Sequence, residues 1–443
     1  MMGKLAIPAL VLFAAFVSRA DGYIVAVEKS SGRQWRAAAD ALAKKHSAKT
    51  VEYSSPAGFA ALAAEMEKSR PKYVCFVTPP GKAGRKFVAA AHDFMRSVGP
   101  GPYSETIWGV VTGYCAEDAV ALSRAPLSQK VESAATSMGS EGFLDKWQAG
   151  IASDENSADN LWVKRRGSAA VKVPTSGNIA KALAAAFNSV ALDYFVTSGH
   201  ASERDWQIIY NRNLGSLVHT PSAGLEFAEP GGRRHKLRLA SLKVYIGAGN
   251  CLLGHIDSKA SMATAWMHSA HVQEFAGYTV PSWYGFMGWG VKDLYETGRH
   301  SLAESCYLEN QRLVWAGRRS PRGHDAMGLE YDKNTFVYYG DPAQKIMFPE
   351  DRTPYTVSVK GGRVRAEFIK DCVFPPLSDV KGARPLTVLL DAPPPGDVLY
   401  DAEGREVENS VVTDRFLFIP APGKHFKGET LEFTIGRGSG RSP

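Results

Sequence analysis

Two short apolar runs that end in reactive side chains decide the fold and the chemistry of this chain. Residues 194–200 read YFVTSGH and residues 244–251 read VYIGAGNC, so the runs end at His200 and Cys251. Short apolar runs bounded by glycine are typical of buried strands. If both strands belong to one parallel sheet, their carboxyl ends meet at the edge where α/β proteins bind ligands. The two runs therefore predict a cysteine–histidine site at one edge of an α/β sheet.

Strand and helix patterns alternate on both sides of these runs, which predicts a parallel sheet covered by helices. The strand patterns cover residues 23–27, 50–53, 73–77, 107–111, 190–197, 242–246 and 272–278, and the helical patterns cover 34–45, 59–68, 85–98, 179–187, 262–271 and 302–315. We expect two α/β subdomains, an N-terminal one over residues 21–165 and a catalytic one over residues 166–345. Residues 128–178 are rich in Ser, Gly, Asp and Asn and predict a helix followed by a long exposed connection between the two.

The pattern changes to all-β at about residue 346. Short alternating runs separated by Gly, Pro and Asp follow, at residues 355–359, 364–369, 386–390, 398–400, 416–419 and 431–435. This spacing predicts an immunoglobulin-like β-sandwich domain over residues 346–435. Residues 436–443 are expected to be a disordered tail.

The first twenty residues have the pattern of a secretory signal peptide. Lys4 precedes an apolar stretch over residues 5–17, and Ser18 and Ala20 place small residues three and one before a cut after Ala20. The apolar stretch is shorter than the about 20 residues that a membrane span needs. We therefore expect an exported protein, secreted, periplasmic or at the cell surface, with no membrane span after signal cleavage.

Composition excludes several classes of protein. With 443 residues, 44% hydrophobic and 22% charged, the chain is an ordinary multidomain globular protein. The formal charge of +7 is mild and no run of Lys and Arg occurs, so we expect no nucleic-acid partner. The five cysteines are widely spaced with no Cys-x-x-Cys, which argues against a disulfide scaffold or a zinc ribbon. Cys75 lies in an apolar run and is expected to be buried.

The chemistry of a cysteine beside a histidine is nucleophilic catalysis. A thiolate is the nucleophile, and an imidazole within reach removes its proton and later returns a proton to the leaving group. Backbone N–H groups at Ala201 and Cys251 are candidates for stabilising the oxyanion. We expect a cysteine endopeptidase in which Cys251 forms an acyl-enzyme and His200 is the general base and acid.

The arrangement resembles the gingipain family in the caspase–gingipain–legumain clan of cysteine peptidases. A strand followed by Gly-His, and a later strand followed by small residues and Cys, carry the resemblance. Residues 107–114 (IWGVVTGY), 116–119 (AEDA) and 277–281 (GYTVP) support it, as does a β-sandwich after the catalytic unit. The family has Gly after the histidine, where this chain has Ala201. The resemblance implies a caspase/gingipain-like fold, a protein or peptide substrate and catalysis without a cofactor; a structural calcium ion stays open.

Several neighbouring side chains are candidates for substrate binding. They are Glu203, Asp205 and Trp206 after the histidine, His255 and Asp257 after the cysteine, and the aromatic residues Trp283, Tyr284 and Trp289. Each group has a structural alternative: a solvated loop for the first, packing beneath a loop for the aromatic residues, and for Asp257 or Ser258 capping of the next helix.

Two other functions stay open at this stage. In the first, the chain is a catalytically inactive relative that presents a peptide-binding cleft and uses its β domain for attachment or adhesion. In the second, it is a metal-dependent hydrolase whose ligands are His200, Cys251, His255 and Asp257, since these residue types suit zinc.

Overall fold

A computed structural model describes residues 22–54, 58–221, 224–239, 242–320 and 322–438. The predicted signal peptide (1–20) and most of the predicted tail (436–443) lie outside these residues. No helix within them is long and apolar enough to cross a membrane.

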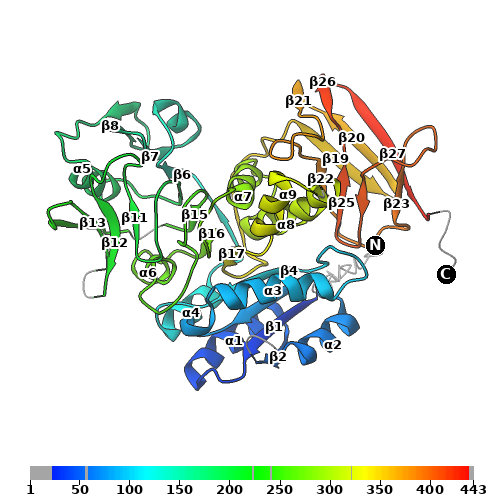
Figure 1. Cartoon of the computed structure of the whole chain (residues 1–443), viewed down its shortest axis with the longest axis horizontal. Helices are drawn as coiled ribbons and strands as arrows, with labels where there is room; N and C mark the ends of the chain where they lie inside the picture. Colours follow the sequence, from blue (N-terminus) through cyan, green and yellow to red (C-terminus); the bar gives the residue numbers. More distant parts are fainter. Residues whose placement is uncertain (1–21, 55–57, 222–223, 240–241, 321, 439–443) are drawn as a thin grey trace, which may run out of the picture.

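A large, mostly parallel mixed sheet of twelve strands forms the centre of the molecule (Figure 1). In spatial order the strands are β2 (Lys49–Tyr53), β1 (Tyr23–Glu28), β3 (Tyr73–Val77), β4 (Ile107–Val111), β17 (Phe336–Tyr339), β16 (Glu274–Tyr278), β15 (Val244–Gly247), β10 (Tyr194–Thr197), β6 (Ser133–Thr136), β7 (Ala149–Asp154), β8 (Ser157–Lys164) and β9 (Ala170–Lys172). The strands of the predicted Cys–His site, β10 and β15, are completely buried, which explains their unbroken apolar sequence. The predicted α/β class therefore agrees with the structure.

The sheet contains two parallel blocks that meet at β17. The strands β2, β1, β3, β4 and β17 run one way, while β16, β15, β10, β6 and β7 run the other way. β17 pairs antiparallel with β16 over four residue pairs and parallel with β4 through the pair Tyr339–Val110. The sheet is thus continuous across the predicted boundary at 165/166, and the division into two subdomains stays a prediction.

Helices cover the sheet and connect its strands. They are α1 (Arg33–His46), α2 (Ala60–Ser69), α3 (Arg85–Ser97), α4 (Ala116–Arg124), α5 (Ile179–Phe187), α6 (Met262–Ser269), α7 (Phe286–Glu296), α8 (Leu302–Arg319) and α9 (His324–Asp332). The N-terminus of α5 follows from local chemistry, because the Asn178 side chain accepts from the Lys181 N–H at 3.0 Å. Ser301 and Glu304 form a capping box at the start of α8.

Residues 128–178 differ from the prediction of a helix and an exposed connection. They form β5 (Ser128–Lys130), then β6 to β9, with one short 3-10 turn over Glu141–Lys146. In β8 the buried side chains are Leu161 and Val163. The alternation of buried and exposed side chains is therefore limited to the second half of the strand, and the first half, SADN, has no strand pattern in the sequence. The segment after His200 contains β11 (Asp205–Gln207), β12 (Ser216–Thr220), β13 (Gly224–Ala228) and β14 (Arg234–Lys236), which form a separate antiparallel sheet.

The C-terminal part is all-β, as expected. One antiparallel sheet contains β19 (Tyr355–Lys360), β20 (Arg363–Phe368), β27 (Thr430–Gly436) and β23 (Val398–Tyr400), and another contains β22 (Leu386–Leu389), β25 (Phe416–Ile419) and β24 (Val411–Val412). Two short pairs complete the set: β21 (Cys372–Phe374) with β26 (Gly423–His425), and β18 (Lys345–Met347) with β5. Side chains from both larger sheets, among them Phe368 and Leu417, share one core. An immunoglobulin-like topology for this unit stays a prediction.

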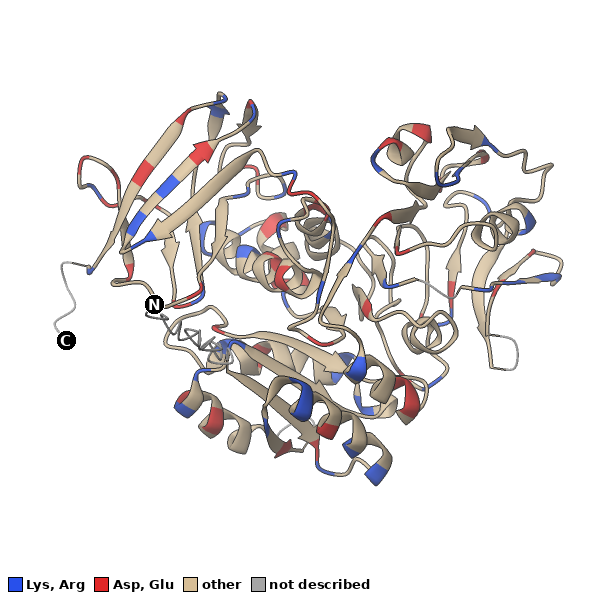
Figure 2. Cartoon of the chain, turned by 180° about the vertical axis from the view of Figure 1, so that it is seen from behind, with Lys and Arg blue, Asp and Glu red and all other residues tan. Residues whose placement is uncertain are grey.

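The β unit packs against α8. The indole of Trp315 contacts the Phe418 ring at 6.1 Å between centroids and donates to the Asn409 carbonyl at 2.7 Å. The buried Glu309 carboxylate accepts from Arg312 on the same helix and, at 2.8 Å, from Arg384 of the β unit. Elsewhere Lys and Arg are interspersed with Asp and Glu over the helices and strands (Figure 2), as expected of a solvated surface.

Candidate functional site at the carboxyl edge of the sheet

The carboxyl ends of the parallel strands β16, β15, β10, β6 and β7 meet along one edge. β10 and β15 are neighbours, with Thr197 opposite Gly247 in register. The segments that follow them carry His200 and Cys251. The prediction that both residues leave the sheet at one edge is therefore confirmed.

Asn250 fastens the two segments to each other. Its side chain is completely buried; it donates from Nδ2 to the Gly199 carbonyl at 3.1 Å and accepts at Oδ1 from the Thr197 hydroxyl at 2.5 Å. The Tyr245 hydroxyl lies 2.6 Å from Thr197 Oγ1 and completes a buried polar chain. Because Asn250 precedes Cys251 and Gly199 precedes His200, these bonds fix the backbone on which both reactive side chains stand.

Two glycines permit this close approach. Gly199 has φ of +100°, a conformation that side-chain-bearing residues rarely adopt. A Cβ atom at Gly249 would lie 2.3 Å from the Ser198 hydroxyl oxygen. The backbone of Gly199 thus favours glycine, and a side chain at Gly249 would displace the Ser198 hydroxyl.

The Cys251 thiol is half-buried and faces Ser282, which follows β16. The Ser282 N–H donates to Sγ at 3.4 Å, and the Ser282 hydroxyl lies 3.5 Å from Sγ while donating to the Gly249 carbonyl at 2.8 Å. Ser282 therefore holds the sulfur in place at the end of the strand edge. Sequence reasoning missed Ser282, and its place just after another strand of the same edge was the available signal.

His200 is exposed and held by an aromatic neighbour. Its ring stacks on Tyr210 with 4.3 Å between centroids and 10° between planes. Within the described residues no hydrogen bond joins the His200 ring to the Cys251 thiol. In unliganded enzymes such catalytic contacts are often long and shorten when substrate binds.

Glu155 is a second residue that sequence reasoning missed. It follows β7 at the same edge, and its carbonyl accepts from the Tyr210 N–H at 2.6 Å. A Cβ atom at Gly199 would lie 3.3 Å from its Oε2, an oxygen that is buried and lacks a hydrogen-bond partner within the described chain. Burial, assisted by the neighbouring Asp154 carboxylate, raises the pKa of Glu155 to about 7. The site therefore contains a carboxyl group beside the histidine segment that changes charge near neutrality.

The predicted substrate-binding residues after His200 mostly make contacts within the protein. Trp206 is only 1% exposed; its indole donates to the Ser198 carbonyl at 2.8 Å and packs on Phe195, so its assignment to substrate was wrong. The Asp205 side chain accepts from the Ser202 hydroxyl. Glu203 is half-buried, and its carbonyl accepts from the first residue of α6 at 2.8 Å.

Asp257 and His255 do not join a metal site with His200 and Cys251. The Asp257 carboxylate binds Arg204 through both oxygens, at 2.8 and 2.6 Å, and accepts from Ser261, which is itself the N-cap of α6 in place of the predicted Asp257 or Ser258. Burial lowers the pKa of His255, whose ring lies against Gly84. In the described chain, the metal-type group is a different one, Cys115, Asp118 and His268. The metal-hydrolase alternative thus loses its ligand set.

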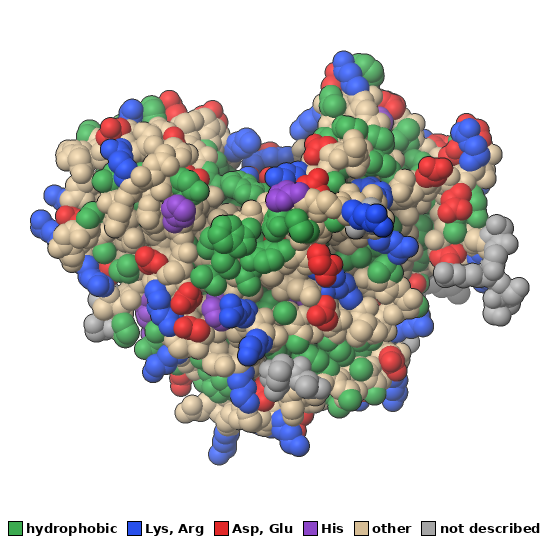
Figure 3. All heavy atoms as spheres, in the orientation of Figure 1, with side chains coloured by type: hydrophobic (Ala, Val, Ile, Leu, Met, Phe, Trp, Pro, Cys, Tyr) green, Lys and Arg blue, Asp and Glu red, His purple; other side chains and the backbone are tan. Residues whose placement is uncertain are grey.

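The predicted aromatic residues lie beside the cysteine segment. Trp283 is 76% exposed and Trp289 is 41% exposed, and a Cβ atom at Gly249 would lie 3.5 Å from the Trp289 ring. Tyr284 packs between Phe286 and Tyr331, as its structural alternative predicted. Figure 3 shows hydrophobic side chains gathered on the face of the molecule over α7 and the neighbouring ends of β15 and β16. The edge therefore combines a thiol with an exposed apolar wall.

Comparison with known proteins finds a distant structural match. No protein-family model and no curated protein matches the chain. A solved structure described as "Structure of Protease" aligns over 94% of this chain and 97% of its own, with 11% sequence identity and a TM-score of 0.43. Similarity at this level establishes neither family nor function.

Proposed function

We propose that the protein is an exported cysteine endopeptidase in which Cys251 is the nucleophile and His200 the general base and acid. The single observation that carries the proposal is the Asn250 bridge, which joins the segment carrying His200 to the segment carrying Cys251 after two adjacent parallel strands. The resemblance of these segments to gingipains adds to it.

In the proposed reaction the Cys251 thiolate attacks the carbonyl carbon of a peptide bond, after His200 has accepted the thiol proton. The resulting oxyanion accepts hydrogen bonds from the backbone N–H groups of Ala201 and Cys251. The tetrahedral intermediate then expels the amine, which takes the proton from His200, and leaves a thioester on Cys251. Water, deprotonated by His200, hydrolyses the thioester and restores the thiol.

Other residues at the edge support this chemistry. The Ser282 N–H donates to the Cys251 sulfur and orients it, and the stacked Tyr210 ring fixes the plane of the histidine ring. We place Glu155 as a positioning residue that acts through Tyr210 and Gly199. The exposed rings of Trp283 and Trp289 offer an apolar wall to side chains of a protein or peptide substrate. This proposal needs no cofactor.

The test is hydrolysis of a peptide library by the purified protein without its first twenty residues. Cys251→Ala and His200→Ala are expected to abolish cleavage, whereas Cys372→Ser, a half-exposed cysteine in the β unit, is the matched control and keeps it. Cleavage by the Cys251→Ala protein would refute the proposal.

The alternative of a non-catalytic peptide-binding protein draws on the missing His200–Cys251 hydrogen bond. It predicts that the wild type binds library peptides without cleaving them and that a thiol-directed active-site probe does not label Cys251 under reducing conditions. Labelling at Cys251 together with cleavage would exclude it.

A further inference from the structure

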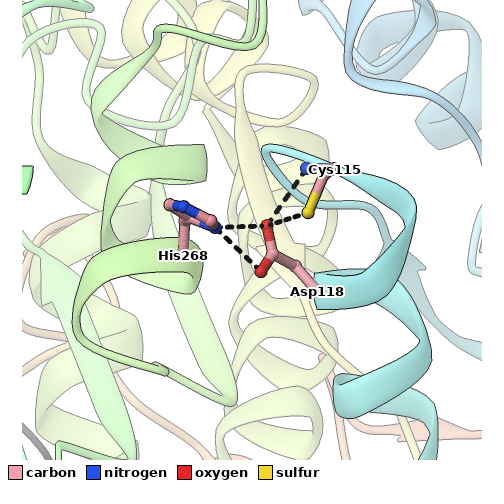
Figure 4. A group of neighbouring side chains, drawn as sticks. All are labelled: Cys115, Asp118 and His268. Carbon is pink, nitrogen blue, oxygen red and sulfur yellow. Dashed lines mark hydrogen bonds and ion pairs between the residues drawn. The ribbon is translucent and has the colours of Figure 1, made fainter. Parts of the chain in front are cut away.

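A second cluster of reactive side chains lies between α4 and α6, away from the residues of the proposed peptidase site. Cys115 precedes α4, Asp118 belongs to its first turn, and His268 belongs to the last turn of α6. Figure 4 shows the imidazole and the carboxylate pointing toward one another across the gap between the helices, with the thiol beside them. Their sulfur, nitrogen and oxygen atoms all lie within 4.8 Å of one another.

The separations within the cluster are near those of ligands on one tetrahedral ion. Cys115 Sγ lies 3.4 Å from Asp118 Oδ2, and His268 Nδ1 lies 3.0 and 3.1 Å from the two Asp118 oxygens, which are hydrogen-bond distances. Ligands bound to zinc at about 2.0–2.3 Å in tetrahedral geometry are about 3.3–3.7 Å apart. Coordination therefore requires the His268 and Asp118 side chains to move slightly apart, while all three ligand atoms already lie within 4.8 Å of one another.

We propose that Cys115, Asp118 and His268 bind a zinc ion that links α4 to α6. One thiolate and one carboxylate neutralise the two charges of the cation, and the imidazole completes a sulfur–oxygen–nitrogen set that suits zinc better than calcium or magnesium. Exposure of 42% at the His268 side chain leaves the fourth position open to water.

The choice of cysteine before α4 supports this use. Ser, Thr, Asp and Asn are the good helix N-caps, and a cysteine in this place caps weakly but ligates metal well. Asp118 accepts from the Cys115 N–H at 3.1 Å, so the helix start holds the carboxylate in position.

A neighbouring aromatic ring orients one of the ligands. The Tyr114 ring stacks on the His268 ring with 4.7 Å between centroids. The Lys259 ammonium lies 5.2 Å from the Tyr114 ring on which His268 stacks. The stacking therefore fixes the plane of the His268 imidazole.

The thiol must lose its proton when the cation binds. Binding exchanges the thiol proton for the cation: a sulfur–zinc bond forms and one proton is released to solvent. Zinc affinity is therefore expected to increase with pH.

The experiment uses the whole chain in a Cys251→Ala background, so that the thiol of the proposed peptidase site does not contribute. After treatment with chelator, the protein is titrated with Zn²⁺ in a calorimeter and with Co²⁺ in a spectrophotometer. We expect one equivalent of Zn²⁺ to bind and to raise the Tm, and Co²⁺ to give the thiolate-to-metal absorption band.

Three variants test the ligands. Cys115→Ser keeps a good helix cap and therefore the fold, but is expected to lose the absorption band and to bind Zn²⁺ at least about tenfold more weakly. His268→Asn is expected to weaken Zn²⁺ to a similar degree, and Cys372→Ser is the matched control with unchanged binding. Absence of saturable Zn²⁺ binding to the Cys251→Ala protein, or equal binding by folded Cys115→Ser, would overturn the proposal.

Discussion

The substitution Asn250→Ala tests the bridge that positions the proposed catalytic pair. Asn250 is completely buried and makes two side-chain hydrogen bonds, to Gly199 and Thr197. The Thr197 hydroxyl retains the Tyr245 hydroxyl, but the Gly199 carbonyl loses its side-chain partner. Two buried hydrogen bonds contribute about 1 kcal/mol each, and an unpaired buried carbonyl costs about 1–3 kcal/mol. The free energy of unfolding is therefore expected to fall by about 3–5 kcal/mol.

The same substitution is expected to lower activity more than a surface change would. Without the bridge, the segments carrying His200 and Cys251 lose their common anchor, and small displacements of a catalytic pair cost about a hundredfold in rate. Peptide hydrolysis should therefore show a lower kcat/KM in the folded variant, at temperatures well below its Tm.

The assay is urea unfolding followed by tryptophan fluorescence and by circular dichroism, with coincident transitions required before a free energy is assigned. Asn211→Ala, at an exposed asparagine, is the matched control and should stay within about 0.5 kcal/mol of the wild type. An Asn250→Ala protein as stable and as active as that control would refute the role given to the bridge.

Five further substitutions test the fold and the site. Asp341 is buried against Lys45 and His46 of α1 and its pKa lies at about 2, so wild-type stability should fall as the pH drops from about 3.8 through 2, and urea midpoints of Asp341→Asn should lack this fall. The raised pKa of Glu155 has the opposite sign: wild-type stability should decrease as the pH rises from 4.5 to 7, and Glu155→Gln should remove the decrease in the same titration. Trp206→Ala should cost about 3–5 kcal/mol in urea unfolding because the indole is buried, whereas Trp283→Ala, at an exposed indole, should change stability by less than about 0.5 kcal/mol; equal losses would contradict both placements. Gly290→Ala places a Cβ atom 2.1 Å from the Glu309 carboxylate and should lower the Tm by disturbing the ion pairs that hold the β unit to α8.

The sequence predicted the strands and the edge that carry the proposed site because their signals are local. β10 and β15 are buried on both faces, so their apolar runs stand out, and the glycines after them mark where the chain leaves the sheet. A parallel pairing then places His200 and Cys251 at one edge without any knowledge of the remaining contacts.

The rest of the site depends on contacts between residues distant in the sequence. Glu155 follows a short strand in a polar segment, and nothing near it indicates that β7 lies two strands from β10. Trp206 stands in the polar sequence Asp-Trp-Gln, which gives no sign that the indole reaches the Ser198 carbonyl beneath the loop. Asp257 had the right chemistry for a ligand, but its partner Arg204 comes from another loop.

The central position of β17 in the sheet affects how the chain folds during synthesis. It is the last strand of the central sheet in sequence, yet it lies in the middle, between β4 and β16. During synthesis both neighbours are complete long before residue 336 emerges, so each presents an unpaired backbone edge to solvent and to other nascent chains. A ribosome-bound or proteolysed fragment that ends before Phe336 should therefore aggregate or recruit chaperones, and the molecule gains its full sheet only when this four-residue strand inserts.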